Sequence, residues 1–193
     1  MDEKIRAAIE QHIAAASTLL AKTELIGRIA SALITVAERG GKILICGNGG
    51  SAADSQHIAA ELVGRFKKER RPAAALALTA DTSVLTSLAN DYGFDKVFER
   101  QVMALGARGD AVIGLSTSGA SPNVANALKK ARELGLLTIG LLGRDGGLIK
   151  QFCDHALVIE NADTPRVQEM HILAAHIICE LIENEIERQK HPS

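Results

Sequence analysis

The first 38 residues carry apolar positions at helical spacing, in two separate stripes. The first stripe contains Ile5, Ala8, Ile9, Ile13, Leu19 and Leu20, and the second contains Ile26, Ile29, Ala30, Leu33 and Val36. This spacing predicts two helices, broken near Lys22-Thr23 and closed by Gly40-Gly41. Two helices cannot bury both stripes by themselves. They therefore cover the edge of a sheet or pair with other subunits.

After residue 40, short apolar runs alternate with helical patterns. The expected strands are 42–46, 74–79, 110–115, 136–142 and 155–160. The expected helices are 51–65, 82–90, 94–106, 122–134 and 165–189. Alternation of this kind predicts an α/β fold in which helices cover both faces of a parallel sheet. Ligands of such sheets bind beyond the carboxyl ends of the strands, so the turns after the strands are the expected site.

Composition agrees with this fold and disfavours some classes of function. The 193 residues are 47% hydrophobic but only 3% aromatic, so Ala, Leu, Ile and Val must build the core. The length fits one domain over 1–193, with N-terminal helices over 1–40 and an α/β core over 41–193. A formal net charge of −1 indicates no basic surface for nucleic acid or for an anionic membrane.

The sequence also indicates where the protein works. It shows no signal-peptide pattern and no apolar run of transmembrane length. Three Cys residues form no CxxC pair, and an odd number is not typical of a disulfide framework. We therefore expect a cytoplasmic protein with reduced, buried thiols.

Two strand-to-helix turns are rich in small hydrogen-bonding residues. The first is 47–51 (GNGGS), where Ser51 and Asp54 predict a start that resembles a capping box. The second is 116–121 (STSGAS), followed by Pro122 at a natural first helical position. Free backbone N–H groups at a helix start bind anions, and hydroxyl groups add donors. Both turns therefore predict contacts to a phosphate.

Either turn alone is also typical of ordinary helix capping. Two such turns at one edge of a sheet favour an anion site instead. Neither turn has the Gly-Lys-Ser/Thr of a Walker A motif or the GxGxxG of a dinucleotide site, which disfavours a nucleotide. A small phosphorylated molecule is the ligand that this pattern favours.

The helix after the first turn places His57 and Glu61 four residues apart, on one face. Such a pair can hold a cation or exchange protons with a substrate, and it is equally typical of a polar surface helix. The neighbouring residues are apolar, so we expect this helix to be largely buried and Glu61 to need a partner. These neighbours are Ile58, Ala59, Ala60, Leu62 and Val63.

The last helix carries Gln168, His171 and His176 among apolar residues. A buried histidine bonded to a carbonyl is the common explanation of either histidine alone. Spacing does not decide whether His171 or His176 belongs to a site.

Four segments together resemble the phosphoheptose isomerases. They are residues 46–66 (CGNGGSAADSQHIAAELVGRF), 89–94 (ANDYGF), 116–121 (STSGAS) and 166–171 (RVQEMH). The resemblance extends over essentially the whole chain, the N-terminal helices included. It implies the SIS (sugar isomerase) fold, a three-layer, doubly wound, five-stranded parallel sheet of the flavodoxin-like type behind a two-helix preface. It also implies a homotetramer in which residues 1–40 serve oligomerisation and active sites lie at subunit contacts.

The resemblance further implies the reaction. Sedoheptulose 7-phosphate becomes D-glycero-D-manno-heptose 7-phosphate through an enediol, the first step toward nucleotide-activated heptose for lipopolysaccharide or other surface glycans. The implied acid/base pair is Glu61 and His176. The implied ligands of one zinc ion per active site are His57, Glu61, Gln168 and His176. The implied substrate contacts are Asn48, Gly49, Gly50, Ser51, Glu61, Asn90, Asp91, Ser116, Thr117, Ser118, Ser121 and Gln168.

The chemistry explains these residue types. Aldose–ketose isomerisation moves a proton between two carbons, so it needs a base at carbon and an acid at oxygen, which a carboxylate and an imidazole supply. Gln168 and His176 lie eight residues apart, about 12 Å along a straight helix. Both reach one metal only if the side chains lean inward, the first turn is distorted, or different subunits contribute.

One alternative is a non-enzymatic SIS protein that binds the replication initiator. Such a protein keeps the fold and the phosphate-like turns but lacks the full metal and acid/base set. The combination of His57, Glu61, Gln168 and His176 favours the enzyme.

Overall fold

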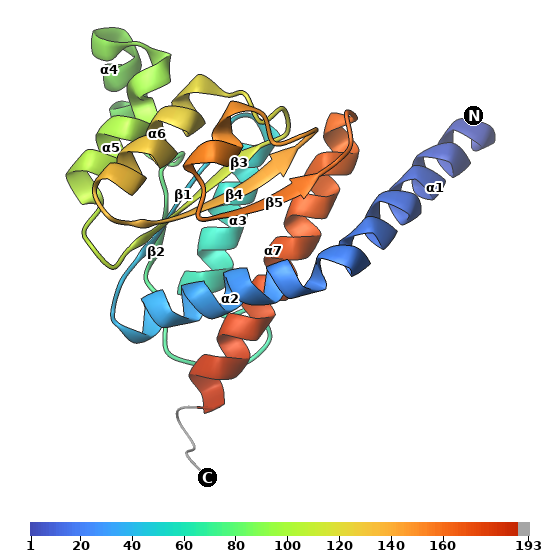
Figure 1. Cartoon of the computed structure of the whole chain (residues 1–193), viewed down its shortest axis with the longest axis horizontal. Helices are drawn as coiled ribbons and strands as arrows, with labels where there is room; N and C mark the ends of the chain where they lie inside the picture. The colour runs from blue at the N-terminus through green and yellow to red at the C-terminus, as the bar shows by residue number, and fades with distance from the viewer. Residues whose placement is uncertain (189–193) are drawn as a thin grey trace.

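The computed structural model describes residues 1–188, and residues 189–193, which include the end of the predicted domain and last helix, lie outside this range. Five parallel strands form one sheet in the order β2-β1-β3-β4-β5, which is the flavodoxin-like order (Figure 1). The strands are β1 (Ile43–Cys46), β2 (Ala75–Ala77), β3 (Ala111–Ser116), β4 (Leu137–Gly143) and β5 (His155–Ile159). The predicted α/β fold is confirmed, and each strand lies within two residues of its predicted bounds.

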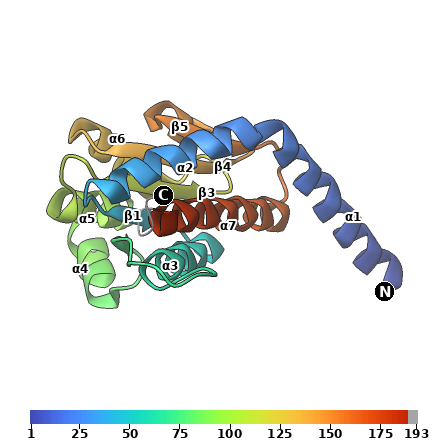
Figure 2. The ribbon, with the colours of Figure 1, turned by 90° about the horizontal axis from the view of Figure 1, so that it is seen from below.

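Helices cover both faces of this sheet (Figure 2). On one face α2 (Thr23–Glu38), α3 (Gly50–Val63) and α7 (Thr164–Arg188) pack into one apolar cluster with the strands. On the other face α5 (Val97–Leu105) and α6 (Pro122–Glu133) form a second cluster. The remaining described helices are α1 (Asp2–Thr18), α4 (Thr82–Tyr92) and the short 3-10 turns η1 (Leu19–Lys22), η2 (Phe94–Lys96) and η3 (Leu148–Phe152).

Strand β1 shows why the sequences of the central strands are largely apolar. Ile43 and Ile45 point into the cluster around α7, whereas Leu44 and Cys46 point into the cluster around α6, and all four are fully buried. Alternate side chains of a strand face opposite sides of the sheet, so in a strand covered on both faces every side chain packs into one core or the other. Each buried aliphatic side chain of this kind contributes roughly 1.5–3 kcal/mol.

The two N-terminal helices lie in different places, and neither covers the predicted sheet edge; pairing with other subunits stays a prediction. Helix α2 lies across a face of the sheet rather than at its edge, with Ile29 and Leu33 fully buried. Helix α1 projects away from the body (Figures 1 and 2). It is attached to α7 by a 2.8 Å contact between His12 and Glu169. Its apolar stripe remains uncovered, because Ile5, Ile9 and Ile13 are 54%, 57% and 58% exposed.

The order of the strands creates one topological switch point. From β1 the chain passes through α3 to β2 on one side, and the later strands β3, β4 and β5 are added on the other side. The chain therefore leaves the carboxyl ends of β1 and β3 in opposite directions. A crevice between the two following turns is the ligand site expected of such a sheet.

Two predictions from composition can be compared with the fold. Within residues 1–188, none of the helices has the length and apolar character needed to cross a bilayer. All three thiols are free, with Cys46 and Cys179 buried and Cys153 half-buried. The prediction of buried thiols therefore holds for two of the three.

Candidate active site

At the turn after β1, the Ser51 N–H donates to the Asn48 carbonyl at 3.0 Å, whereas the N–H groups of Gly49 and Gly50 have no hydrogen-bond partner among residues 1–188. Gly49, with φ +57°, occupies the residue before the helix, and no side chain caps the helix there. The predicted capping by Ser51 is wrong, because α3 begins at Gly50 and Ser51 is buried inside its first turn. Asp54 does not act as a cap either. One of its carboxylate oxygens is buried without a hydrogen-bond partner; burial raises the pKa of this carboxyl, and His57 partly offsets the rise.

The turn after β3 gathers three hydroxyl groups at the start of α6. The Ser116 hydroxyl lies 2.9 Å from that of Ser121 and 3.4 Å from that of Ser118. Pro122 occupies the first turn of the helix, as predicted, and Ser121 precedes it without capping it. Thr117 is held close to β4, because a Cβ at Gly143 would lie 2.0 Å from the Thr117 carbonyl oxygen. The backbone of this turn therefore packs closely against β4.

The two turns are joined to each other. The amide of Asn48 donates to Asn123 at 2.9 Å, and the amide of Asn123 donates back to Asn48 at 2.8 Å. The turns lie at the same edge of the sheet, as expected. Asn123, which is buried, is absent from the predicted site residues. Its only signal in the sequence is its place in the first turn of the helix after the serines.

Helices α3 and α7 bring two histidines and a glutamate together. Nε2 of His57 lies 3.1 Å from a carboxylate oxygen of Glu61 and 3.4 Å from Nε2 of His176. One ligand atom from each of the three residues lies within 4.8 Å of the others. The side chains of His57 and Glu61 are 45% and 22% exposed, so the group opens to the surface.

This group fits a zinc ion. Ligand atoms about 2.0–2.1 Å from a tetrahedral zinc lie roughly 3.3 Å from one another. Two of the three separations, 3.1 and 3.4 Å, match that geometry, and all three lie within 4.8 Å. Two imidazoles and a carboxylate are ordinary zinc ligands, and three protein ligands leave a position for substrate, as in catalytic zinc sites.

The structure shows which of the two histidines belongs to the site, which spacing alone did not decide. His176 belongs to the group, whereas His171 is fully buried and neither of its ring nitrogens has a well-formed hydrogen bond. Burial lowers the pKa of His171 to about 4, against a smaller opposing effect of the Leu142 backbone. His171 is thus a neutral core residue near neutral pH.

Gln168 lies near the glycine turn. A Cβ added at Gly50 would be 2.4 Å from the side-chain nitrogen of Gln168. Gln168 thus pairs with Gly50, while His176, two turns later, pairs with His57. Helices α3 and α7 therefore run side by side in the same direction. In this arrangement Gln168 is in reach of the phosphate turns, and its direct binding to the metal stays a prediction.

Asn90 and Asp91 lie at the exposed end of α4, bonded to each other at 2.9 Å. Among residues 1–188 no hydrogen bond connects them to either turn, so a single chain does not bring them to the other predicted contacts.

Helix α3 is less buried than its apolar sequence predicts. Ile58, Ala59 and Leu62 are in the core, but Ala60 is exposed and Val63 is 47% exposed. The expectation of a largely buried helix is therefore wrong. The helix has a buried face toward the sheet and an exposed face that carries His57 and small apolar side chains.

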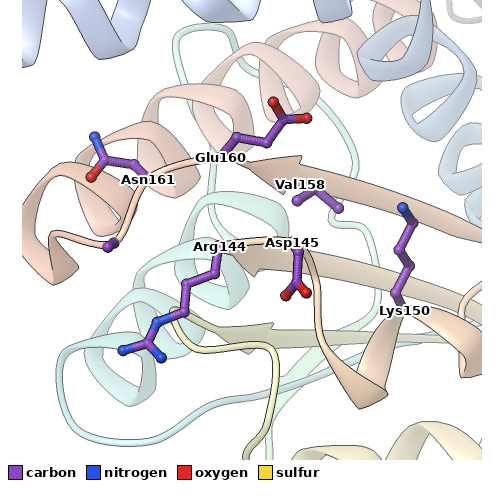
Figure 3. Close-up of a pocket in the computed structure, with 7 residues that line it drawn as sticks. Arg144, Asp145, Lys150, Val158, Glu160 and Asn161 are labelled. Atoms are coloured by element: carbon purple, nitrogen blue, oxygen red, sulfur yellow. The ribbon is translucent and has the colours of Figure 1, made fainter.

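A separate cavity of about 530 Å³ lies at the ends of β4 and β5 (Figure 3). Arg144 and Lys150 project on either side of Asp145, and Glu160 and Asn161 form the opposite wall. None of the predicted site residues lines this cavity. The region of the two turns, where the predicted phosphate contacts gather, therefore remains the candidate site.

Comparison with known proteins agrees with this geometry. The model of the SIS domain family matches residues 3–143. A phosphoheptose isomerase of Aliarcobacter butzleri is 62% identical over 77% of this chain and 79% of its own length. One from Clostridium acetobutylicum is 50% identical over 98% of both chains. A solved phosphoheptose isomerase from Neisseria gonorrhoeae superposes with a TM-score of 0.88 at 44% identity, over 95% of this chain and 98% of that one.

These relatives give no support to the initiator-binding alternative. The solved relative shares the fold over nearly the full length of this chain. The chain therefore belongs to the SIS domain family and, within it, to the phosphoheptose isomerases.

Proposed function

We propose that this protein isomerises sedoheptulose 7-phosphate to D-glycero-D-manno-heptose 7-phosphate, with Glu61 and His176 as the acid/base pair. The observation that carries the proposal is the group of His57, Glu61 and His176 beside two phosphate-type turns. The high identity to phosphoheptose isomerases supports the choice of substrate.

The two turns bind the phosphate end of the sugar. The hydroxyl groups of Ser116, Ser118 and Ser121 and the free N–H groups of Gly49 and Gly50 are donors for phosphate oxygens. Asn48, Ser51 and Thr117 complete the predicted contacts of these turns. Binding at this end leaves C1 and C2 free to reach the exposed face of α3 and α7, where proton transfer takes place.

Glu61 and His176 move the protons. One of them removes a proton from C1 of the open-chain ketose while the other gives a proton to the C2 oxygen, which forms the enediol. Removal of the O1 proton and return of a proton to C2 then gives the aldose, so the two residues end in their starting protonation states. The assignment of base and acid in each direction remains open.

We also propose one zinc ion per active site. His57, Glu61 and His176 would hold it, and Gln168 is the fourth predicted ligand. When bound, zinc polarises the carbonyl of the sugar and orients its neighbouring hydroxyl groups. Dialysis against a chelator should remove both metal and turnover, and zinc should restore both; full activity of metal-free protein would contradict this assignment.

The active protein is proposed to be a homotetramer in the cytoplasm. The uncovered isoleucines of α1 support association, as does a row of partly exposed apolar residues on α7 beside His176. This row consists of Leu173, Ile177 and Leu181. A neighbouring subunit that covers it would bring further residues to the site, such as Asn90 and Asp91, which one chain leaves apart.

The direct experiment is incubation with sedoheptulose 7-phosphate and detection of the aldose by NMR. The Glu61→Gln variant should form no product, because it removes the carboxylate and keeps the shape, while circular dichroism and oligomeric state should stay unchanged. Near-normal turnover by this variant would exclude Glu61 as a catalytic residue.

A further inference from the structure

A short loop directly after α3 packs an aromatic side chain against His176. The ring centroids of Phe66 and His176 are 5.4 Å apart and the ring planes are tilted by 34°. The His176 ring also meets the His57 ring edge to face, with centroids 5.0 Å apart. His176 thus has two ring neighbours, one inside the metal-type group and one outside it.

A buried carboxylate determines where Phe66 lies. Glu183, two turns beyond His176 on α7, accepts hydrogen bonds from the backbone N–H groups of Phe66 at 2.8 Å, Lys67 at 2.7 Å and Lys68 at 2.9 Å. Its side chain is 1% exposed. Three charge-assisted bonds to consecutive residues leave the loop little freedom.

Arg70 connects the same carboxylate to the end of α3. Its guanidinium is also 1% exposed and lies 3.6 Å from Glu183. It donates to the backbone carbonyls of Glu61 at 2.6 Å and Leu62 at 2.8 Å, in the last turn of α3, where carbonyls have no partner within the helix. The buried pair of Arg70 and Glu183 therefore joins the turn of α3 that carries Glu61 to the helix that carries His176.

Exposed contacts complete the loop. The ammonium of Lys67 lies 5.2 Å from the Phe66 ring centroid and forms an ion pair with Glu180 at 2.9 Å. Glu180, Glu183 and Glu187 follow one another along one side of α7, and each holds part of the loop. The outer pairs are open to water, so the buried one carries the constraint.

We propose that Phe66 is a positioning residue, held in place by Glu183 and Arg70, which keeps the His176 ring directed at His57 and Glu61. The inference rests on the proposed function. An imidazole on a partly exposed helix face has several rotamers, and contact with a fixed ring favours one of them. Catalysis and metal binding both depend on such placement, because an error of about 1 Å can lower a rate on the order of a hundredfold.

The test compares Phe66→Leu with Phe66→Tyr, which keeps the ring. We measure kcat and KM for sedoheptulose 7-phosphate, and zinc affinity by competition with a chromophoric chelator. For the leucine variant we expect kcat to fall about tenfold or more and zinc affinity to fall about tenfold, with KM within roughly threefold. The tyrosine variant should remain within about threefold of the parent in all three quantities.

Three results would overturn the proposal. These are parental kcat and zinc affinity in the leucine variant, equal losses in both variants, and a higher KM with unchanged kcat, which would assign Phe66 to substrate binding. Circular dichroism and sedimentation verify the fold and assembly of each variant. If the leucine variant does not fold, Phe66→Met takes its place, since a flexible apolar chain fills the same space without a ring.

The metal measurement separates this inference from the proposed function. If the parent protein does not turn over sedoheptulose 7-phosphate, the proposed function fails. Zinc affinity that depends on the ring at position 66 would still support the positioning of His176. Zinc affinity that does not depend on this ring would refute the positioning role, whatever the reaction.

Discussion

Replacing Glu183 by Gln changes a single atom of the side chain, yet we expect a large loss of stability. The carboxylate accepts three backbone hydrogen bonds and is the charge partner of Arg70, and both side chains are 1% exposed. In the variant an NH2 group faces backbone N–H donors, and the Arg70 guanidinium is buried without a counter-charge. Removing one partner of a buried pair costs about 3–5 kcal/mol.

In a chain of this size that cost lowers the melting temperature by roughly 6–20 °C. Thermal unfolding followed by circular dichroism measures the effect. Glu187→Gln is the matched control, because Glu187 lies one turn further along α7 and pairs with Lys68 of the same loop in an exposed position. We expect the control to melt with the parent protein. A Glu183→Gln variant that melts within about 2 °C of the parent would refute the reasoning.

The same variant has a defined pH dependence. Burial acts to raise the pKa of the Glu183 carboxyl, but the three N–H donors and Arg70 outweigh it and hold the pKa below the ordinary value of 4.5. A group with a lowered folded-state pKa stabilises the protein above the unfolded-state pKa, and this contribution is lost as pH falls through the folded-state pKa. The stability difference between parent and Glu183→Gln should therefore be constant near neutral pH and shrink below about pH 4.5.

Two further variants test the crevice and the association surface. Gly50→Ala should raise KM on the order of tenfold with little change in melting temperature, because the new methyl group displaces the Gln168 side chain. In a protein that already carries Gln168→Ala, the Gly50→Ala substitution should have little further effect on KM. An additive loss in the double variant would contradict this coupling. Ile9→Glu should reduce the oligomer to smaller species in analytical ultracentrifugation, because it places a charge in the uncovered stripe of α1. The control Glu10→Gln, on the same helix, should leave the oligomer intact. An unchanged sedimentation coefficient for Ile9→Glu would contradict a role of this stripe in assembly.

The fold follows closely from the apolar pattern, because the central strands β1, β3 and β4 are short runs buried on both faces and most helices repeat an apolar stripe. That pattern did not show which histidine of α7 belongs to the active site. His171 and His176 are five residues apart, so they lie roughly 140° apart around the helix and cannot both face the sheet. Which one faces inward depends on how α7 packs against β4 and α3, and that is a property of the whole fold.

The contacts of Glu183 that hold the loop next to His176 could not be predicted from the sequence either. Glu183 and Phe66 lie 117 positions apart, and nothing in either neighbourhood distinguishes Glu183 from the exposed glutamates around it. Likewise, the apolar residues Ala60 and Val63 predicted burial for α3, although in one chain they face outward. An apolar side chain indicates that a surface becomes covered, but it does not tell whether the same chain covers it.

The parallel packing of α3 and α7 also has a consequence for how the protein is made. Helix α3 emerges early in synthesis with His57 and Glu61, while α7 follows more than a hundred residues later with Gln168, His176 and Glu183. Until α7 docks, one face of the sheet is covered only by α2 and α3, and the ion-binding group lacks His176. The nascent chain therefore completes its sheet before the last helix of this face is made, and capacity for metal and for proton transfer arises together when α7 docks.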